Sequence, residues 1–321
     1  MAVSNRLVID TDPGIDDALT LALAVVSPEV DLQLVTTVAG NSPLEVTTRN
    51  ALALLDLFGR PDIPVAAGAN RALVRIAVHN LPLPHGLNGL GGVEIPDACR
   101  TAQPEHAVER LAALLRDAEP RSVTIAAIGP LTNVALLVAL YPELTDRIDR
   151  LVVMGGSHGP GNITPVAEFN TWTDPEAAQR VLADSGLDIT LVGLEVTRRA
   201  TIDEADLATL RRTSARGAQL ADMVNGYSDH GPDGWRMHDV LALAAVIDPT
   251  LIQTLDARIE VDTRLGPGRG QTLTFFDALG PYATDGGGVA DDRPRVQVAV
   301  DLDVPRFRKL VMDRVPQAIL A

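Results

Sequence analysis

Short runs of β-branched and aliphatic residues alternate along the chain with longer runs that are rich in alanine and leucine. The short apolar runs predict buried strands, and the longer runs predict helices. The predicted strands cover residues 7–9, 32–38, 63–67, 123–128, 150–154 and 189–194, and the predicted helices cover residues 18–26, 43–58, 105–117, 131–140 and 175–183. Strands that are apolar on both faces and separated by helices indicate parallel β-α-β units. We therefore expect an α/β fold with an open, mostly parallel, Rossmann-like sheet and helices on both of its faces.

The last third of the chain departs from this alternation and predicts a C-terminal extension. The predicted elements there are a helix, a loop and a helix over residues 203–247, strands at 271–277 and 295–300, a Gly/Asp/Pro-rich loop at 280–293 that joins them, and a final helix at 305–313. We find no internal repeat, heptad pattern or separating linker, so residues 1–321 are expected to form one domain. Two long irregular stretches, 68–103 and 155–170, contain His, Asn and Gly, and loops of this length in a compact domain are usually functional or disordered.

Composition narrows the classes of partner. Hydrophobic residues make up 46% of the chain but aromatic residues only 3%, so the core must be aliphatic. The chain has 27 basic and 42 acidic residues, a net charge of −15. This charge repels phosphate backbones and argues against nucleic acid, whereas it suits a divalent cation or a neutral small molecule.

Cysteine content and hydropathy indicate the compartment. The single cysteine, Cys99, cannot form an internal disulfide framework, which favours a reducing cytoplasm. The polar first residues do not resemble a signal peptide, and no stretch approaches the roughly 18 uninterrupted apolar residues of a membrane helix. We therefore expect a cytoplasmic protein with no membrane partner.

Four carboxylates follow the first predicted strand: Asp10, Asp12, Asp16 and Asp17. Ligands bind at the carboxyl ends of the strands in an open α/β sheet, so this is where a site is expected. Carboxylates this close repel one another unless a cation lies among them, and an oxygen-only set favours Ca²⁺ or Mg²⁺ over zinc. A helix start explains acidic residues at Asp16 and Asp17, but it leaves Asp10 and Asp12 at a buried strand end unexplained. The cluster therefore predicts a metal site or a site for sugar hydroxyls.

At these residues the chain resembles the nucleoside hydrolase family of the inosine–uridine type. The family's motif Asp-x-Asp-Pro-Gly-x-Asp-Asp is present without a gap at residues 10–17. The other matching segments are Val-Ala-Gly-Asn at 38–41, Gly-Pro-Leu-Thr-Asn at 129–133, Met-Gly-Gly at 154–156, Asn162, Ala-Glu-Phe-Asn at 167–170, Asp-Pro-Glu-Ala-Ala at 174–178 and His-Asp at 238–239. They follow in family order over most of the chain. The resemblance implies the nucleoside hydrolase fold and hydrolysis of the N-glycosidic bond of uridine, cytidine or inosine to free base and ribose.

The resemblance also implies a cofactor, Ca²⁺, and its ligands. The implied ligands are Asp12, Asp17, Asp239 and the backbone carbonyl of Ile128. Such an ion holds ribose hydroxyls and lowers the pKa of a bound water. Asp12 is implied to accept the proton of that water as general base. Asp10 is expected to be a supporting carboxylate beside the metal ligands, without binding the ion itself.

The implied ribose-binding residues are Asp16, Asn41, Asn162, Glu168 and Asn170. Ribose hydroxyls both donate and accept hydrogen bonds, so a dry pocket needs matched carboxylates and amides. Turn statistics alone favour an ordinary loop for the segment around Glu168. The other segments that match the family are the reason to expect a binding site there.

Two histidines are implied to approach the base. His238 is expected to protonate the leaving base, a role that suits a side chain titrating near neutrality. His85 lies in a Gly-rich segment, 85–92, that predicts a mobile flap. His79 and Asn88 receive no role.

Base preference stays open at this stage. Pyrimidine-preferring relatives place a Gln and a Tyr in the stretch that corresponds to residues 225–236. Tyr227 and His230 are present there, but their spacing to His238 does not fit that pattern. The histidine at 238 favours the inosine–uridine or pyrimidine side of the family, and Trp172 near the ribose loop is equally consistent with a core position.

Two other functions remain as alternatives. A haloacid-dehalogenase-type phosphohydrolase also has Asp-x-Asp after the first strand, but Gly14 replaces its Thr or Val, and the only lysine, Lys309, is not in its central region. A non-catalytic nucleoside or ribose binder could keep the fold without the base or the acid, so the complete set of Asp12 and His238 favours catalysis. Family members are commonly oligomers, so a homodimer or homotetramer is expected.

Overall fold

The computed structural model describes residues 5–74, 84–276 and 294–320. The strands are β1 (Asn5–Thr11), β2 (Val30–Thr37), β3 (Val65–Ala67), β4 (Val123–Ala127), β5 (Ile148–Met154), β6 (Ile189–Val192), β7 (Thr201–Ile202), β8 (His230–Gly231), β9 (Gly234–Arg236), β10 (Ile252–Val261), β11 (Thr272–Phe276) and β12 (Val296–Leu302). The α-helices are α1 (Ile15–Val26), α2 (Leu44–Leu57), α3 (Ala107–Arg116), α4 (Thr132–Leu140), α5 (Phe169–Thr173), α6 (Pro175–Leu182), α7 (Leu194–Thr197), α8 (Glu204–Thr213), α9 (Ala215–Asn225), α10 (His238–Ile247) and α11 (Val304–Ala318).

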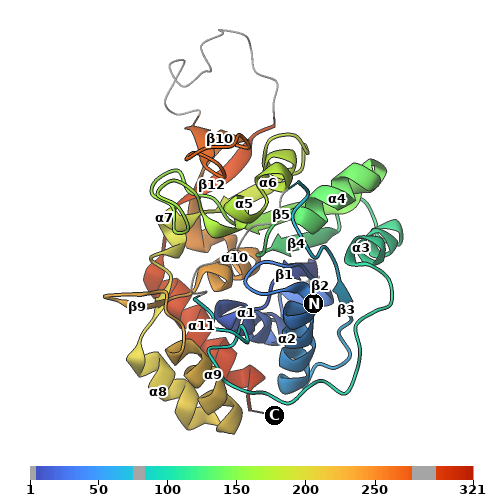
Figure 1. Cartoon of the computed structure of the whole chain (residues 1–321). Helices are drawn as coiled ribbons and strands as arrows, with labels where there is room; N and C mark the ends of the chain where they lie inside the picture. Colours follow the sequence, from blue (N-terminus) through green and yellow to red (C-terminus); the bar gives the residue numbers. More distant parts are fainter. Residues whose placement is uncertain (1–4, 75–83, 277–293, 321) are drawn as a thin grey trace, which may run out of the picture.

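Within these residues the strands form a nine-stranded sheet in the order β11-β10-β12-β6-β5-β4-β1-β2-β3 (Figure 1). The strands from β3 to β12 are parallel, and β10 pairs antiparallel with both β12 and β11. The predicted α/β fold with a mostly parallel sheet is confirmed. The strand order reverses direction between β1 and β4, and this switch point is where an open α/β sheet binds its ligand.

Helices cover both faces of the sheet because alternate strand residues point to opposite sides. In β1, Leu7 and Ile9 join one hydrophobic cluster, and Val8 joins the other. The first cluster includes residues of α1, α2 and α7 to α11, and the second includes residues of α3, α4 and α6. The carboxyl ends of the strands are thus held in a rigid frame.

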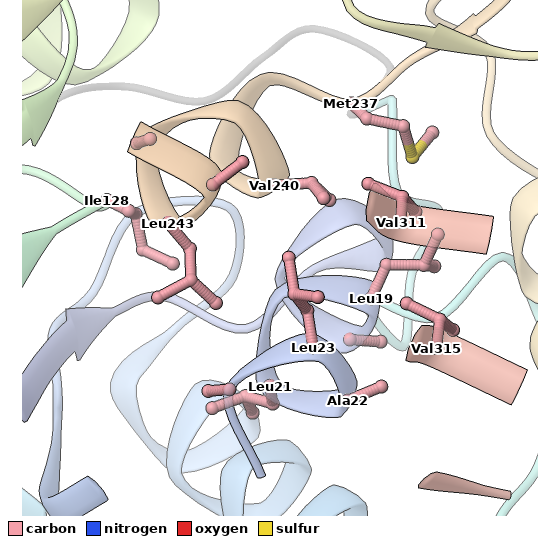
Figure 2. Packing of buried hydrophobic residues seen from close by; sticks show 14 of the residues in the cluster. Leu19, Leu21, Ala22, Leu23, Ile128, Met237, Val240, Leu243, Val311 and Val315 are labelled. Atoms are coloured by element: carbon pink, nitrogen blue, oxygen red, sulfur yellow. The ribbon is translucent and has the colours of Figure 1, made fainter. Parts of the chain in front are cut away.

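Helix α1 is buried along most of its length, which is unusual for a helix that carries two carboxylates. Every residue from Ile15 to Ala24 is buried, Asp16 and Asp17 included. Its apolar side chains pack against α10 and α11, with Leu19 and Leu23 near Val240, Val311 and Val315 (Figure 2). The two acidic side chains at its N-terminus are therefore fixed in position by core packing.

Several elements differ from the sequence prediction. Strand β10 was not predicted, because its polar and charged positions interrupt the apolar pattern. The helix–loop–helix predicted for residues 203–247 is instead three helices, α8, α9 and α10, with the short strands β8 and β9 between the last two. The stretch 280–293 and His79 lie outside the described residues. Among the helices that are described, none is both long and apolar enough to cross a membrane.

Candidate active site

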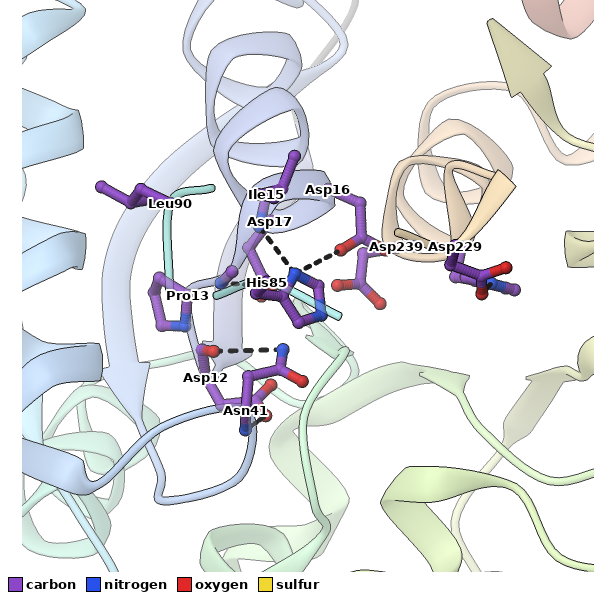
Figure 3. A network of polar contacts seen from close by, with 12 residues as sticks. Asp12, Pro13, Ile15, Asp16, Asp17, Asn41, His85, Leu90, Asp229 and Asp239 are labelled. Carbon is purple, nitrogen blue, oxygen red and sulfur yellow. Dashed lines mark hydrogen bonds and ion pairs between the residues drawn. The ribbon is translucent and has the colours of Figure 1, made fainter. Parts of the chain in front are cut away.

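Asp12 lies just beyond β1 with one carboxylate oxygen bound and the other free. The backbone N–H of Asn41 donates to Asp12 Oδ2 at 2.6 Å, and the Asn41 side-chain amide donates to the Asp12 carbonyl at 3.3 Å (Figure 3). Asp12 Oδ1 is buried and accepts no hydrogen bond from the described residues. A Cβ at Gly129, just beyond β4, would lie 2.7 Å from this oxygen, so only glycine leaves the space beside it clear.

Asp16, Asp17 and Asp239 form a buried carboxylate triad in which one oxygen of each lies within 4.8 Å of the others. Asp17 accepts hydrogen bonds from the Thr11 hydroxyl and, at 2.7 Å, from the Gly14 backbone N–H. The backbone N–H of Asp239, in the first turn of α10, lies 3.4 Å from Asp16 Oδ2. The N-terminal ends of α1 and α10 therefore bring together carboxylates that are far apart in sequence.

Burial and mutual repulsion destabilise the ionised form of this cluster. Burial, with the charge of Asp17, raises the pKa of Asp16 to about 7. Burial raises the pKa of Asp12 and of Asp239 well above the ordinary value, and neighbouring carboxylates add to the effect. A divalent cation would remove the conflict, and the donors are all oxygen atoms, which suits a hard ion. The cluster could therefore hold a metal ion.

Asp10 lies behind the cluster, at the end of β1. Its Oδ1 accepts hydrogen bonds from Thr36 Oγ1 at 2.5 Å and from Asn133 Nδ2 at 2.8 Å, while its Oδ2 is buried without a partner among the described residues. Burial raises its pKa to about 6 despite these hydrogen bonds. Asp10 does not line the cavity described next.

A cavity of about 640 Å³ opens beside the triad at the carboxyl ends of the strands. Asp12 and Asp17 do not line this cavity. The other two residues of the triad, Asp16 and Asp239, do line it. The predicted site residues that line the cavity are Asp16, Asn41, His85, Ile128, Asn162, Glu168, Asn170, His238 and Asp239.

On one side of the cavity the segment before α5 is tied down by its own polar side chains. Glu168 accepts hydrogen bonds from the backbone N–H groups of Gly156, Asn170 and Thr171 at 2.9 to 3.1 Å. Asn170 Nδ2 donates to the Ile128 carbonyl at 2.9 Å, which leaves that oxygen a second lone pair. These contacts order the carboxylate and the amides that are predicted to bind ribose.

His85 closes the cavity from the Gly-rich segment. Its Nδ1 accepts the backbone N–H of Ile15 at 3.0 Å and lies 3.9 Å from Asp16 Oδ1 (Figure 3). Its ring stacks on Tyr227 with 4.8 Å between centroids. Burial lowers the pKa of His85 to about 3, so the ring is neutral and carries its hydrogen on Nε2. Asn88 Oδ1 accepts the N–H groups of Leu90 and Gly92, so Asn88 shapes the segment.

His238, at the start of α10, is held at both ring nitrogens. Nδ1 lies 2.7 Å from Thr197 Oγ1 and Nε2 lies 2.9 Å from Asp229 Oδ2. Arg236 Nη1 donates to the other oxygen of Asp229 at 2.5 Å. Asp229 and Arg236 also line the cavity.

Sequence reasoning assigned no role to Asp229, Arg236 or Thr197. Asp229 lies in the stretch 225–236 that was expected on the base side, but the family pattern for that stretch contains a Gln and a Tyr and no aspartate. No sequence pattern marks Thr197, because its contact with His238 depends on the packing of α7 against α10. His230 and Trp172 do not line the cavity; Trp172 packs against Gly270 instead.

Known proteins resemble this chain in sequence and in fold. Residues 7–309 match the family model described as inosine-uridine preferring nucleoside hydrolase. The chain is 43% identical over 307 residues to a non-specific ribonucleoside hydrolase, RihC, of Escherichia coli, with 95% of this chain and 96% of that protein covered. It is 39% identical over 317 residues to a pyrimidine-specific ribonucleoside hydrolase, RihA, of Klebsiella pneumoniae, with 96% and 97% covered. Its fold is similar to a purine-preferring ribonucleoside hydrolase from Gardnerella vaginalis, with a TM-score of 0.87, 35% identity, and 98% of this chain and 100% of that chain covered.

Proposed function

The chain belongs to the inosine-uridine preferring nucleoside hydrolase family and is thus an enzyme that acts on N-glycosyl bonds, and we propose that it hydrolyses uridine, cytidine or inosine to free base and ribose. One observation carries the proposal. A single cavity is lined by two carboxylates of the buried triad, by the polar side chains suited to ribose, and by His238. The names of the relatives differ in base preference, so the base is left to experiment.

The reaction needs three kinds of help. A water oxygen bonds to C1′ of the ribose, the C1′–N bond breaks with its electron pair going to the base, and the base takes up a proton. We assign proton acceptance from the water to Asp12, whose free oxygen is suited to it. We assign proton donation to the base to His238, which lines the same cavity as the residues assigned to ribose.

The ribose is assigned to Asp16, Asn41, Asn162, Glu168 and Asn170. All five line the cavity, and Glu168 and Asn170 are buried and fixed by hydrogen bonds to backbone groups. Fixed carboxylates next to the ring favour the positive charge that develops on ribose as the bond breaks.

Asp12, Asp17, Asp239 and the Ile128 carbonyl would hold the cation, which we propose is Ca²⁺. When bound, the ion offsets the clustered negative charge, orients ribose hydroxyls and lowers the pKa of a water. The unpartnered Oδ1 of Asp12 and the raised pKa values of the cluster support this assignment. Asp16 belongs to the same triad and lines the cavity, and the family resemblance is what assigns it to ribose.

The proposal is tested with a panel of uridine, cytidine, inosine, adenosine and guanosine. We expect ribose release from at least one of the first three, loss of release after EDTA treatment, and recovery with Ca²⁺. Absence of ribose from the entire panel with Ca²⁺ present would refute the enzyme proposal. Activity that survives complete chelation would refute the cation assignment alone.

We also propose a cytoplasmic homodimer or homotetramer that serves nucleoside breakdown or salvage. This part rests on the family resemblance and on the single cysteine. Light scattering of the purified chain tests it, and a monomer at micromolar concentration contradicts it.

A further inference from the structure

The loop after β5 carries Asn162 to the cavity without regular secondary structure. Residues 155–166 form no helix or strand. Asn162 lines the cavity and is exposed. The only hydrogen bond that its side chain accepts from the described residues comes from the Phe169 N–H, at 2.9 Å to Oδ1. The position of this amide, which is assigned to ribose, therefore depends on how the loop is held.

Glu195, near the start of α7, holds the first half of this loop. Its Oε1 accepts the Ser157 hydroxyl at 2.7 Å and the Gly159 backbone N–H at 2.9 Å. Its Oε2 lies 3.7 Å from His158 Nε2. The Glu195 side chain is only 18% exposed, so water has little access to these contacts. One carboxylate thus contacts three consecutive residues of the loop.

Two more side chains attach the loop to the fold. Thr272 Oγ1, in β11, accepts the Ser157 N–H at 2.8 Å and donates to the Ser157 carbonyl at 2.7 Å. Arg198 Nη2, just past the end of α7, donates to the carbonyl of Gly161 at 2.8 Å, immediately before Asn162. The start of the loop is therefore fixed by β11, and the stretch that leads to Asn162 is held from both ends of α7.

The place of α7 against the end of β5 explains why Glu195 reaches the loop. The N–H of Leu194 donates to the Gly156 carbonyl at 3.1 Å. A Cβ at Gly193, which precedes α7, would lie 3.0 Å from Glu195 Oε2 and 3.1 Å from the same Gly156 carbonyl oxygen. A side chain at position 193 would crowd both the carboxylate and the backbone, so the glycine lets α7 lie directly against the loop.

We propose that Glu195 is a positioning residue for ribose recognition, which holds residues 157–159 so that Asn162 is placed to bind a ribose hydroxyl. This inference rests on the proposed function, in which Asn162 binds ribose. Glu195 does not line the cavity, so it acts through the loop and not on the substrate. A binding group must stay within about 0.5 Å of its productive position, and a loop without regular structure needs fixed side-chain contacts to achieve this.

Two substitutions of Glu195 separate its hydrogen bonds from its charge. In the Ca²⁺-loaded enzyme we expect Glu195→Ala to lower kcat/KM for the nucleoside that is hydrolysed fastest by about 10- to 100-fold, the range for a small misplacement of a binding group. Glu195→Gln should stay within about threefold of wild type, because its Oε1 still accepts both hydrogen bonds. Equal losses in the two variants would contradict positioning by hydrogen bonds.

A double-mutant cycle with Asn162→Ala distinguishes positioning from general damage. If Glu195 acts through Asn162, adding Glu195→Ala to Asn162→Ala should lower kcat/KM by less than about twofold more. The matched control is Glu204→Ala, because Glu204 is an exposed glutamate at the start of α8 that does not line the cavity. Glu204→Ala should leave kcat/KM unchanged, both alone and together with Asn162→Ala.

Hydrogen exchange examines the loop itself, without substrate. Amide exchange in residues 157–163 should be faster in Glu195→Ala than in the wild type, and unchanged in Glu195→Gln and in Glu204→Ala. Ser157→Ala removes one of the same contacts from the loop side. It should raise exchange and lower kcat/KM by a smaller amount, and it serves in place of Glu195→Ala if that variant fails to fold.

Full additivity of Glu195→Ala and Asn162→Ala would overturn the inference, as would unchanged exchange in residues 157–163. Failure of the proposed function is a different result, in which the wild-type enzyme releases no ribose from any nucleoside. An active wild type whose Glu195→Ala variant is equally active contradicts this inference alone.

Discussion

Asp12 shows how one side chain can serve two demands. Its Oδ2 is anchored by the Asn41 backbone, and its Oδ1 remains free in a space that Gly129 keeps open. An anchored oxygen orients the carboxylate, and a free oxygen can bind a cation or take a proton. The residue is therefore preorganised, with no hydrogen bond to break before it reacts.

Asp12→Asn tests this arrangement. The amide oxygen should keep the Asn41 contact and place NH₂ where Oδ1 was, a group that neither accepts a proton nor binds a cation. We expect kcat for nucleosides to fall at least about 1,000-fold and Ca²⁺ binding by calorimetry to weaken. Asp31→Asn, at an exposed position of β2, is the control. Activity within tenfold of wild type would contradict the assignment.

At the scale of elements, Asp174, which precedes α6, connects three parts of the fold through its carboxylate. Its Oδ1 accepts the Ala177 backbone N–H at 3.0 Å as a helix cap, and its Oδ2 accepts Thr132 Oγ1 at 2.7 Å and the Leu73 N–H at 2.9 Å. One carboxylate thus joins α6, α4 and the segment after β3. Burial nevertheless raises its pKa in the folded protein, and this outweighs the hydrogen bonds.

The raised pKa of Asp174 predicts a pH-dependent contribution to stability. A pKa that is higher in the folded state means that the contribution is complete below the unfolded value of 3.8 and is lost as pH rises through the folded value. The asparagine of Asp174→Asn does not titrate. The wild type should therefore have the higher free energy of unfolding, and its advantage over the variant should be larger at pH 4.5 than at pH 7.5. Urea unfolding at both pH values measures the difference. A gap that widens with pH would contradict the prediction.

The small sheet β7-β9-β8 depends on a glycine. Gly234 has a φ of +119°, and a Cβ there would lie 2.1 Å from the Ile202 carbonyl oxygen of β7. Both the backbone angle and the strand pairing therefore exclude a side chain.

Gly234→Ala should destabilise the protein by about 1–3 kcal/mol or more and lower nucleoside activity, because β9 carries Arg236 and adjoins Asp229. The control is Gly186→Ala, where φ is +69° but no atom lies within 4 Å of the added Cβ. Thermal unfolding should show the larger loss for Gly234→Ala. Equal losses would mean that the clash with β7 is relieved at no cost.

At the scale of the whole molecule, the sequence predicted the central sheet well because its parallel strands are apolar on both faces. The positions of Asp10 to Asp17 could be predicted for the same reason, since side chains just past a buried strand meet at one edge of the sheet. Strand β10 could not be predicted, because polar residues interrupt its apolar pattern. The contact between Thr197 and His238 arises only from the packing of α7 and α10, which no local pattern encodes.

The burial of α1 has a consequence for how the chain is made. This helix is translated well before α10 and α11, which cover part of it. Until then the nascent protein carries an apolar helix with clustered negative charge that lacks the part of its native cover that α10 and α11 supply. The carboxylate triad also lacks Asp239 during this time. Formation of the site is therefore a late step of biosynthesis, and an N-terminal fragment ending before α10 cannot assemble it.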